Sequence, residues 1–409
     1  MLMTRPFRLV WCAWLLAAVS LGAQDWPQFL GPDRDGHYQG PPVDVNWGEE
    51  GPPEVWSRPV GSGFAGPVVA DDRLLLFHRV DRSEVLEALD AATGETIWRY
   101  EYPTTYRDDF GFDEGPRSAP VVADGRVVTF GAQGQLHVVS LASGESIWSV
   151  DTQERFGLRK GFFGAAGSPL VQDGRVIANI GGSDAGVVAF DAASGDVLWT
   201  STEDEASYSS GVPLQLDGET LALFLTRNFL FGLNPVDGSV RFTQPWRARM
   251  RASVNAASPV VVDDLVFVSA EYGPGAGVFR VTGSNLEEVW RSDDVLSNHY
   301  ATSVHHDGVL YGFHGRQEYG PSLRAVDLLS GEVYWSADAF GGGSVTLAGD
   351  RLVVMREDGE LLITDATPAA LTPLARAQVL PAVVRAYPAL ANGRLYVRNG
   401  DTLVCLDLR

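Results

Sequence analysis

The stretch ALDAATGETIW, from Ala88 to Trp98, decides the fold of this chain because copies of it recur along the sequence. The copies are VVSLASGESIW at 138–148, AFDAASGDVLW at 189–199 and AVDLLSGEVYW at 325–335, with a looser one, GLNPVDGSVRF, at 232–242. Each copy is typical of a strand, a tight turn that ends in Thr-Gly or a similar pair, and a second strand that ends in an aromatic residue. Internal repeats of this kind indicate a fold assembled from similar units.

A second series of turns lies before the first, between short runs that are rich in Val, Leu, Ile and Phe. Its members are Asp71-Asp72, Asp124-Gly125, Asp173-Gly174, Asp217-Gly218, Asp263-Asp264, Asp307-Gly308, Gly349-Asp350 and Asn392-Gly393. Two hairpins in every period of about 40 to 50 residues make four antiparallel strands, which is one propeller blade. The predicted fold is therefore all-β, an eight-bladed β-propeller of four-stranded antiparallel blades.

The last blade lacks its outermost strand, since the sequence stops at Arg409. Residues 54–60 (EVWSRPV) resemble that strand, with Trp56 in the aromatic position. We expect this N-terminal strand to pair with the C-terminal strands and close the ring. Closure would also remove an open sheet edge, which invites aggregation.

The N-terminus has the three-part layout of a secretory signal peptide. Arg5 and Arg8 precede the apolar run 9–19, and small residues follow at 20–23. We therefore expect a signal peptide over 1–23, a latch segment over 24–42 and the propeller over 43–409. The protein is expected to be periplasmic or secreted, and no further apolar run is long enough to predict a transmembrane span.

The net charge argues against some classes of binding partner, and the cysteine count argues against a disulfide. The formal net charge is −21, and an acidic surface repels nucleic acid and anionic lipid. Cys405 is the single cysteine that remains without the leader, so no internal disulfide is expected. We expect a monomer.

The pattern Ala-x-Asp-x-x-Thr-Gly-x-x-x-Trp resembles the tryptophan-docking repeat of the pyrroloquinoline-quinone-like (PQQ-like) propellers. This family includes quinoprotein alcohol dehydrogenases and BamB-like proteins, and the resemblance covers residues 50–409. Residues 25–36 (DWPQFLGPDRDG) are similar to the N-terminal segment of an exported bacterial BamB-like branch. The resemblance implies that the repeated Trp and Gly residues are structural, so they carry no functional information.

The resemblance also implies what a quinone enzyme would add to this fold. Such enzymes have a vicinal Cys-Cys pair against the cofactor, a calcium ion bound by Glu, Asn and Asp, and a catalytic Asp. The chain has no Cys-Cys pair and no Cys-x-x-Cys-His haem site, and no motif places the calcium ligands.

The two faces of the predicted ring differ in sequence. One carries short, nearly interchangeable turns, while the other carries the irregular loops between the second and third strands and the crossovers between blades. The expected ligand-binding residues at this channel mouth are Arg117, Lys160, Ser209, Arg227, Asn255, His299, Tyr300, His314, Arg316 and Gln317. Guanidinium groups suit carboxylates and phosphates, so the mouth is expected to bind a small anionic or polyhydroxylated ligand, or a protein partner.

The alternative interpretation is that each arginine only ties loops together through a neighbouring acid. Arg79 would then pair with Asp81, and Arg356 with Glu357. Metal sites are not expected. Residues 33–44 begin like a calcium loop but have glycine in the fourth position instead of the sixth, and His305-His306 have no third ligand in the sequence.

Two functions remain open. The first is a non-catalytic binding or scaffold protein. The second is a PQQ-dependent oxidoreductase that would hold quinone and calcium in the same mouth, with Arg117, Asn255, Arg316 and Asp109 around them.

Overall fold

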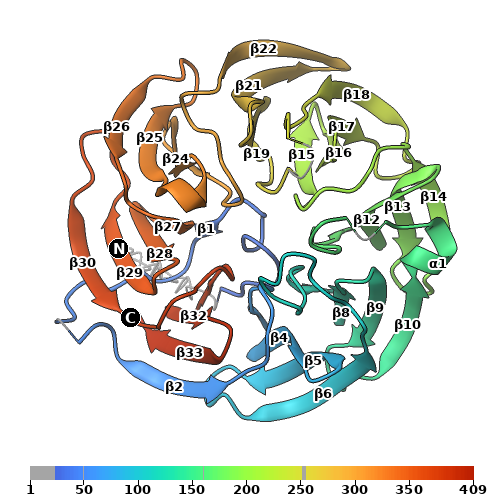
Figure 1. Cartoon of the computed structure of the whole chain (residues 1–409), viewed down its shortest axis with the longest axis horizontal. Coiled ribbons are helices and arrows are strands. Elements are labelled where there is room, and N and C mark those ends of the chain that lie inside the picture. The colour runs from blue at the N-terminus through green and yellow to red at the C-terminus, as the bar shows by residue number, and fades with distance from the viewer. Residues whose placement is uncertain (1–23, 49, 160, 251–254) are drawn as a thin grey trace, which may run out of the picture.

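The computed structural model describes residues 24–48, 50–159, 161–250 and 255–409. The predicted signal peptide lies outside these residues. Eight antiparallel sheets are arranged as blades around a central axis (Figure 1). The predicted eight-bladed propeller is confirmed.

The first four blades follow the chain in order, and each runs from an inner to an outer strand. Blade 1 has β3 (Val68–Ala70), β4 (Arg73–Val80), β5 (Ser83–Asp90) and β6 (Thr96–Pro103); blade 2 has β7 (Val121–Ala123), β8 (Arg126–Phe130), β9 (Gln135–Ser140) and β10 (Ser146–Asp151); blade 3 has β11 (Leu170–Gln172), β12 (Arg175–Gly182), β13 (Ala185–Asp191) and β14 (Val197–Ser201); blade 4 has β15 (Val212–Leu216), β16 (Glu219–Leu225), β17 (Phe229–Leu233) and β18 (Val240–Pro245).

The other four blades include two strands from the N-terminal region. Blade 5 has β19 (Val260–Val262), β20 (Leu265–Ala270), β21 (Gly275–Thr282) and β22 (Asn285–Ser292); blade 6 has β23 (Val304–His306), β24 (Val309–His314), β25 (Ser322–Asp327) and β26 (Val333–Ala337); blade 7 has β27 (Gly343–Ala348), β28 (Arg351–Arg356), β29 (Glu360–Asp365) and β30 (Pro373–Gln378), with β1 (His37–Tyr38) on its inner side; blade 8 has β31 (Ala389–Ala391), β32 (Arg394–Arg398), β33 (Thr402–Asp407) and, outermost, β2 (Glu54–Pro59).

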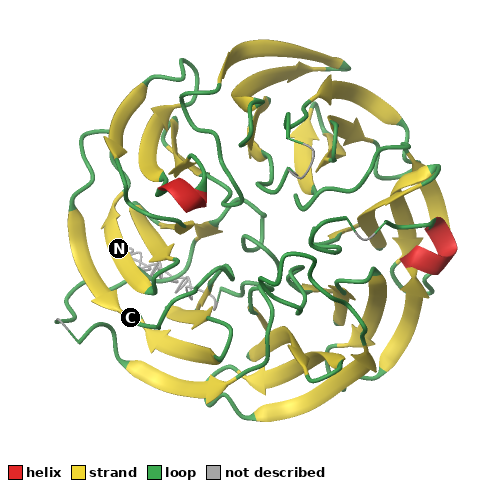
Figure 2. Ribbon diagram, viewed as in Figure 1, coloured by secondary structure: helices red, strands yellow, loops and turns green. Residues whose placement is uncertain are grey.

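Helix is scarce among the described residues. Figure 2 shows one short α-helix, α1 (Thr152–Phe156), after blade 2 and one 3₁₀ turn, η1 (Gln317–Tyr319), inside blade 6. In the described part of the chain, no helix has the length and apolar character needed to cross a bilayer.

The repeated turn forms because its acid binds the backbone that follows. In blade 1, Asp90 Oδ1 accepts hydrogen bonds from the amides of Ala92 (2.9 Å) and Thr93 (2.8 Å). Gly94 completes the turn at φ +73°, where a side chain would be strained.

The repeated tryptophans join each blade to the next. Trp98 donates from Nε1 to the backbone oxygen of Leu141 in blade 2 (2.9 Å), and its ring packs over Gly144 in the same turn. The same bond recurs at other blade interfaces, from Trp56 to Ala91, Trp148 to Ala192, Trp199 to Pro235, Trp290 to Leu328 and Trp335 to Thr367. The repeat is therefore an interface motif as well as a turn motif.

The ring closes as the sequence predicts. Strand β2 pairs antiparallel with β33, and Trp56 lies opposite Cys405. Since β2 completes blade 8, the first and last parts of the propeller share one sheet.

The latch segment crosses the central channel, where Figure 1 shows it as the blue loop in the middle of the ring. Trp26 exchanges two 2.8 Å backbone hydrogen bonds with Val69 of blade 1, and β1 runs parallel to β27. Backbone bonds also join the segment to Val122 of blade 2 and Asn392 of blade 8. The segment therefore closes the channel from within.

Arg34 fixes the middle of the latch segment. Its guanidinium is buried, and it donates to the backbone oxygens of Pro169 and Gly211, the latter at 2.8 Å. These two residues directly precede the inner strands of blades 3 and 4. One side chain thus ties the segment to both blades.

Candidate functional site

A cup of about 280 Å³ opens at the centre of the face that carries the crossovers. Its walls come from seven blades or their crossovers and from the latch segment. The lining residues are Phe29, Phe64, Gly66, Phe112, Arg117, Phe163, Ala166, Ser168, Tyr208, Ser210, Ala256, Tyr272, His299, Tyr300, Gln317, Glu318, Arg385 and Tyr387.

Aromatic side chains are the largest group in the lining of the cup. Eight of its eighteen lining residues are Phe or Tyr. Phe29 of the latch segment is part of the lining, and its ring meets that of Tyr387 edge-on with centroids 4.8 Å apart. Burial raises the pKa of Tyr387 to about 12, so its hydroxyl stays protonated at neutral pH and accepts from the Thr302 amide at 2.5 Å. The cup is an open cavity with a largely apolar surface.

Arg117 is held on the wall by one carboxylate and several rings. Its Nη2 lies 3.0 Å from Oδ2 of Asp108, whose side chain is fully buried. The guanidinium also lies over the rings of Phe64 (5.4 Å) and Phe163 (5.7 Å). Burial alone would raise the pKa of Asp108, but hydrogen bonds from nearby amides and the charge of Arg117 lower it. The Asp108 carboxylate is therefore ionised at neutral pH.

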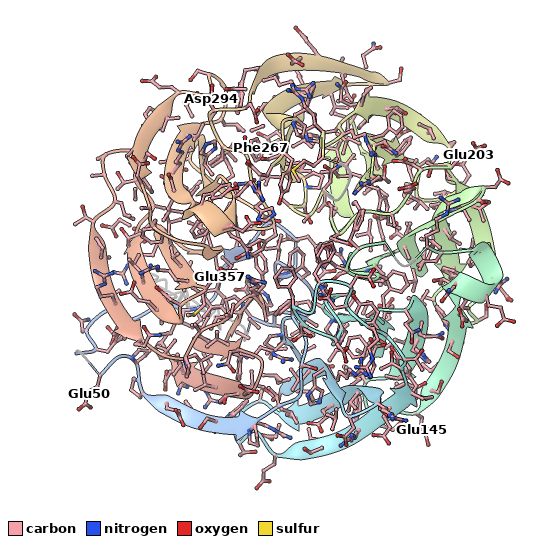
Figure 3. All side chains as sticks on the ribbon, in the orientation of Figure 1. Glu50, Glu145, Glu203, Phe267, Asp294 and Glu357 are labelled. Atoms are coloured by element: carbon pink, nitrogen blue, oxygen red, sulfur yellow. The ribbon has the colours of Figure 1, made fainter. Side chains whose placement is uncertain are left out.

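Arg385 makes a second pair with Glu357 near the centre of the ring. Its Nε lies 2.7 Å from Glu357 Oε1, which also accepts from the Tyr300 hydroxyl at 2.8 Å. Figure 3 shows Glu357 close to the centre, whereas Glu50, Glu145 and Glu203 lie on the periphery. The Arg385 guanidinium lies 5.6 Å from the ring centroid of Phe64, so this ring contacts both arginines of the cup.

A third pair lies on the side of blades 5 and 6. Arg316 Nη2 lies 3.1 Å from Glu318 Oε1, and its guanidinium lies over Tyr272 at 4.7 Å. The Tyr272 hydroxyl is 2.9 Å from Nε2 of His299. Burial lowers the pKa of His299, which keeps the imidazole neutral at pH 7. The cup therefore presents donors and acceptors side by side.

Pairing with acids is thus the common state of the mouth arginines. The partners differ from the two expected pairs, because the folded loops bring other acids within reach of Arg79 and Arg356. Arg79 pairs with Glu114 (3.5 Å) and contacts Asp81 through its backbone oxygen. Arg356 pairs with Asp358 and Glu360, while Glu357 is taken by Arg385.

Four of the ten predicted site residues line the cup: Arg117, His299, Tyr300 and Gln317. Arg316 stands behind its partner Glu318. Arg227 lines a smaller neighbouring hollow of about 60 Å³ and lies over the ring of Phe162. Lys160 lies outside the described residues.

Three predicted site residues have structural contacts instead. The buried Asn255 donates to the backbone oxygens of Thr226 (2.7 Å) and Trp246 (3.0 Å). Ser209 is buried, and its amide bonds to the Asn255 oxygen. His314 accepts the Ser297 amide at 3.0 Å on Nδ1. These side chains stabilise the crossovers that carry the cup.

The aromatic lining was missed by sequence reasoning that followed charge. Phe112, Phe163 and Tyr208 lie in the same irregular crossovers that supplied the candidates Arg117, Lys160 and Ser209. Clusters of Phe and Tyr in crossovers, which have no strand to pack in, were the available signal. Phe29 had no such signal, because nothing local indicates that the latch segment enters the channel.

The opposite face has no preformed metal site among the described residues. His305 and His306 share a hollow there with a third histidine, His37 of the latch segment. Asp35, from the calcium-like stretch, instead lies 3.3 Å from His37. Over the described residues, no group of three or more His, Cys, Asp or Glu side chains could hold a metal ion.

A calcium-bound quinone in the cup would need several free oxygen ligands for the ion. Glu318 is the single carboxylate of the lining, and it is already paired with Arg316. Asn255, the amide expected beside the ion, is committed to backbone oxygens. The described residues do not fit a calcium-bound quinone at this position.

Known proteins resemble the chain in both sequence and fold. A 166-residue stretch is 30% identical to the dehydrogenase subunit of a quinone alcohol dehydrogenase from Komagataeibacter europaeus, covering 38% of this chain and 20% of that protein. A 247-residue stretch is 23% identical to outer membrane protein assembly factor BamB from Yersinia pestis, covering 56% and 60%. The matches therefore span less than two thirds of either relative.

Among solved structures, BamB from Moraxella catarrhalis superposes with a TM-score of 0.61 at 15% identity, covering 87% of this chain and 98% of that one. A europium-containing methanol dehydrogenase superposes with a TM-score of 0.67 at 11% identity, covering 91% and 89%. At these identities the superpositions show a shared fold.

A family model decides the relationship at the level of the whole propeller. The model described as outer membrane protein assembly factor BamB matches residues 81–318 and 320–408, which include most of the blades. By its repeats, its fold and this match, the chain belongs to the BamB family of PQQ-like repeat propellers.

Proposed function

We propose that this protein is an exported binding protein whose cup holds a small, neutral, polyhydroxylated ligand such as a sugar ring. The observation that carries the proposal is the combination of aromatic walls with arginine–carboxylate pairs in one cavity. Apolar walls with a few placed polar groups are what small-ligand sites have in common. Flat rings also favour a ligand with an apolar face.

Charge pairing favours a neutral ligand over an anionic one. Arg117, Arg385 and Arg316 each have a carboxylate partner, so little net positive charge is left for an anion. Such a pair still offers unused N–H donors next to carboxylate lone pairs. Hydroxyl groups are both donors and acceptors, and they match this arrangement.

The size of the cup favours a ligand of about one ring. Its volume of about 280 Å³ lies at the lower end for small-molecule sites, which span roughly 300–1,000 Å³. Phe29 of the latch segment is one of the walls of this cavity. A ligand longer than one ring would extend through the open side of the cup.

Thermal unfolding and calorimetry with D-glucose, D-galactose, D-mannose and N-acetylglucosamine test the proposal. At least one sugar should raise the midpoint of unfolding, because a ligand that binds the folded state stabilises it. Phe64→Ala should weaken binding at least about tenfold, roughly 1.4 kcal/mol. This ring contacts both cup arginines and lines the cavity.

Tyr334→Ala is the matched control, since Tyr334 is an exposed aromatic residue on the outer strand β26, away from the cup. It should bind as tightly as the unchanged protein. Stabilisation by glucuronate or phosphate with none by the neutral sugars would contradict the neutral-ligand proposal. No binding of any of these compounds would contradict a sugar site.

The family relationship supports an envelope or extracellular location, in line with the expected signal peptide. It also supports a second candidate, in which the mouth loops hold a protein partner, because the family description concerns outer membrane protein assembly. Co-purification of a partner that is released by Phe64→Ala, together with no sugar binding, would favour this candidate. A dye-linked oxidation assay with added quinone and calcium tests the oxidoreductase; turnover would replace both binding proposals.

A further inference from the structure

The rim of the cup carries two exposed phenylalanines, of which Phe112 belongs to the lining and Phe110 does not. Phe110 and Phe112 are 51% and 58% exposed, although both are large apolar side chains. Their rings are close to parallel, at 21°, with centroids 6.3 Å apart. Phe163 lies 5.1 Å from Phe110 and 6.1 Å from Phe112. We call these three rings the aromatic strip.

The strip continues the cup outward. Phe112 and Phe163 belong to the cup lining, whereas Phe110 lies beyond it and contacts both of them. A ligand ring in the cup therefore has a second flat apolar surface beside it, on the open side. Contiguous exposed apolar surface of this kind marks binding sites on soluble proteins.

The loop that carries the strip is held in place by the buried Asp108. The Asp108 carboxylate accepts from the amides of Phe110 (2.9 Å), Phe112 (3.1 Å) and Asp113 (3.1 Å), and it also pairs with Arg117. A carboxylate with these partners fixes the backbone between them. The backbone that carries the two exposed rings is thus ordered before a ligand binds, which reduces the entropy lost on binding.

Polar groups beside the strip repeat the chemistry of the cup. In the same loop, Arg107 pairs with Glu114 at 2.5 Å, and the Arg107 side chain is 72% exposed. The guanidinium of Arg385 also lies 5.7 Å from the ring centroid of Phe112, so the strip has flat apolar faces with paired charged groups beside them. A second sugar ring matches this arrangement, while the acidic chain disfavours an anionic membrane surface.

We propose that the aromatic strip is a second ring-binding subsite, so that the ligand is an oligosaccharide of two or more units with its terminal unit in the cup. The proposal rests on the sugar-binding function proposed above. It predicts that affinity rises with chain length and that Phe110 carries much of the gain.

The experiment compares glucose with cellobiose and maltose, measuring Kd by calorimetry. At least one disaccharide should bind the unchanged protein about tenfold more tightly than the monosaccharide. Phe110→Ala should remove the difference between the two Kd values, and Phe110→Tyr, which keeps the ring, should restore it. Tyr334→Ala should keep the difference. Because Phe110 is half exposed, the midpoint of thermal unfolding of Phe110→Ala should match that of the unchanged protein.

The outcomes separate this inference from the function on which it rests. Binding of glucose with no gain for either disaccharide, or a gain that survives Phe110→Ala, would overturn the second subsite and leave the cup as proposed. Binding of no saccharide at all would overturn the proposed function itself. If Phe110→Ala instead weakened binding to phosphatidylcholine vesicles, the strip would be a membrane contact, and the subsite would be rejected.

Discussion

At the scale of single residues, the Arg34 side chain joins the latch segment to two blades of the ring. It is 3% exposed, and its acceptors are the amide oxygen of Gln28 and backbone oxygens of blades 3 and 4. These acceptors are neutral, and burial lowers the pKa of Arg34 to about 9. The cost of burying the cation is offset by bonds that hold the latch segment across the channel.

Replacing Arg34 with Met should lower the free energy of unfolding by about 2–4 kcal/mol, because buried backbone oxygens lose their donors. Urea denaturation measures the change. Arg34→Lys, which keeps a single ammonium donor but loses the planar guanidinium, should have a free energy of unfolding between those of the unchanged protein and the Met variant. A Met variant with unchanged stability would mean that the latch segment does not depend on this side chain.

His137 makes stability depend on pH. It is buried against Tyr102, with ring centroids 4.0 Å apart, and its Nδ1 lies 2.9 Å from the Tyr100 hydroxyl. Burial lowers its pKa to about 4, whereas an unfolded histidine titrates near pH 6.5. Below pH 6.5 the unfolded chain therefore binds the proton first, so the contribution of His137 to stability is lost as the pH falls from 6.5 towards 4.

Because of His137, the free energy of unfolding should fall by an amount on the order of 1–2 kcal/mol between pH 7 and pH 5. His137→Phe, which keeps a ring in the stack but does not titrate, should flatten the fall in unfolding free energy over this range. Urea denaturation at several pH values measures it. An equally steep fall in the variant would assign the pH dependence to other groups.

At the scale of elements, the tryptophan-docking contact determines how blades stack. Trp148 of β10 packs on the turn of blade 3, where a Cβ on Gly195 would lie 2.7 Å from the indole. Gly195 also has a φ of +76°. The glycine is therefore needed twice, by the turn and by the neighbouring ring.

Gly125 allows the two requirements to be measured separately. It has a φ of +69°, as a turn glycine does, but nothing lies close to its Cβ position. Gly125→Ala should cost about 1 kcal/mol from backbone strain, and Gly195→Ala should cost at least about 1 kcal/mol more, from the clash with Trp148. In a Trp148→Ala background, which itself should cost about 3–5 kcal/mol, the extra cost of Gly195→Ala should vanish. Denaturation of the four variants measures the coupling; additive costs would show that the ring and the glycine do not interact.

At the scale of the whole molecule, two N-terminal elements hold the ring in different ways. Strand β2 closes the circle from outside through β33, and the latch segment fills the centre. Removal of β2 would leave the outer edge of β33 unpaired, and such edges associate with other chains.

A chain that begins at residue 60, without either element, should unfold at least about 10 °C below the full protein and aggregate on heating. A chain that begins at residue 43 keeps β2 and serves as the control; it should lose less stability and stay dispersed. Thermal unfolding with light scattering measures both. Equal midpoints for the two chains would show that β2 is not needed for closure.

The repeats made the ring predictable, because each blade is specified by local turns, alternating strands and one tryptophan. The stretch 54–60 could be assigned to the last blade since it fills the gap that the repeat leaves. The sequence predicted where the cup lies but not the composition of its walls. Arg117, His299, Tyr300 and Gln317 lie where the strand count puts them, but ion pairing and the aromatic walls arise between crossovers that no local pattern connects.

By itself, then, the sequence determined the number of blades, their strand order, the closure of the ring and the face on which irregular loops gather, since hydrogen-bonded turns and strand alternation are local properties of the chain. Tertiary structure alone decided that the latch segment plugs the channel with Phe29 and Arg34, that Arg385 pairs with Glu357, and that Phe110 extends the cup outward. Those contacts join residues from different blades, and their distances depend on how the closed ring brings the crossovers together.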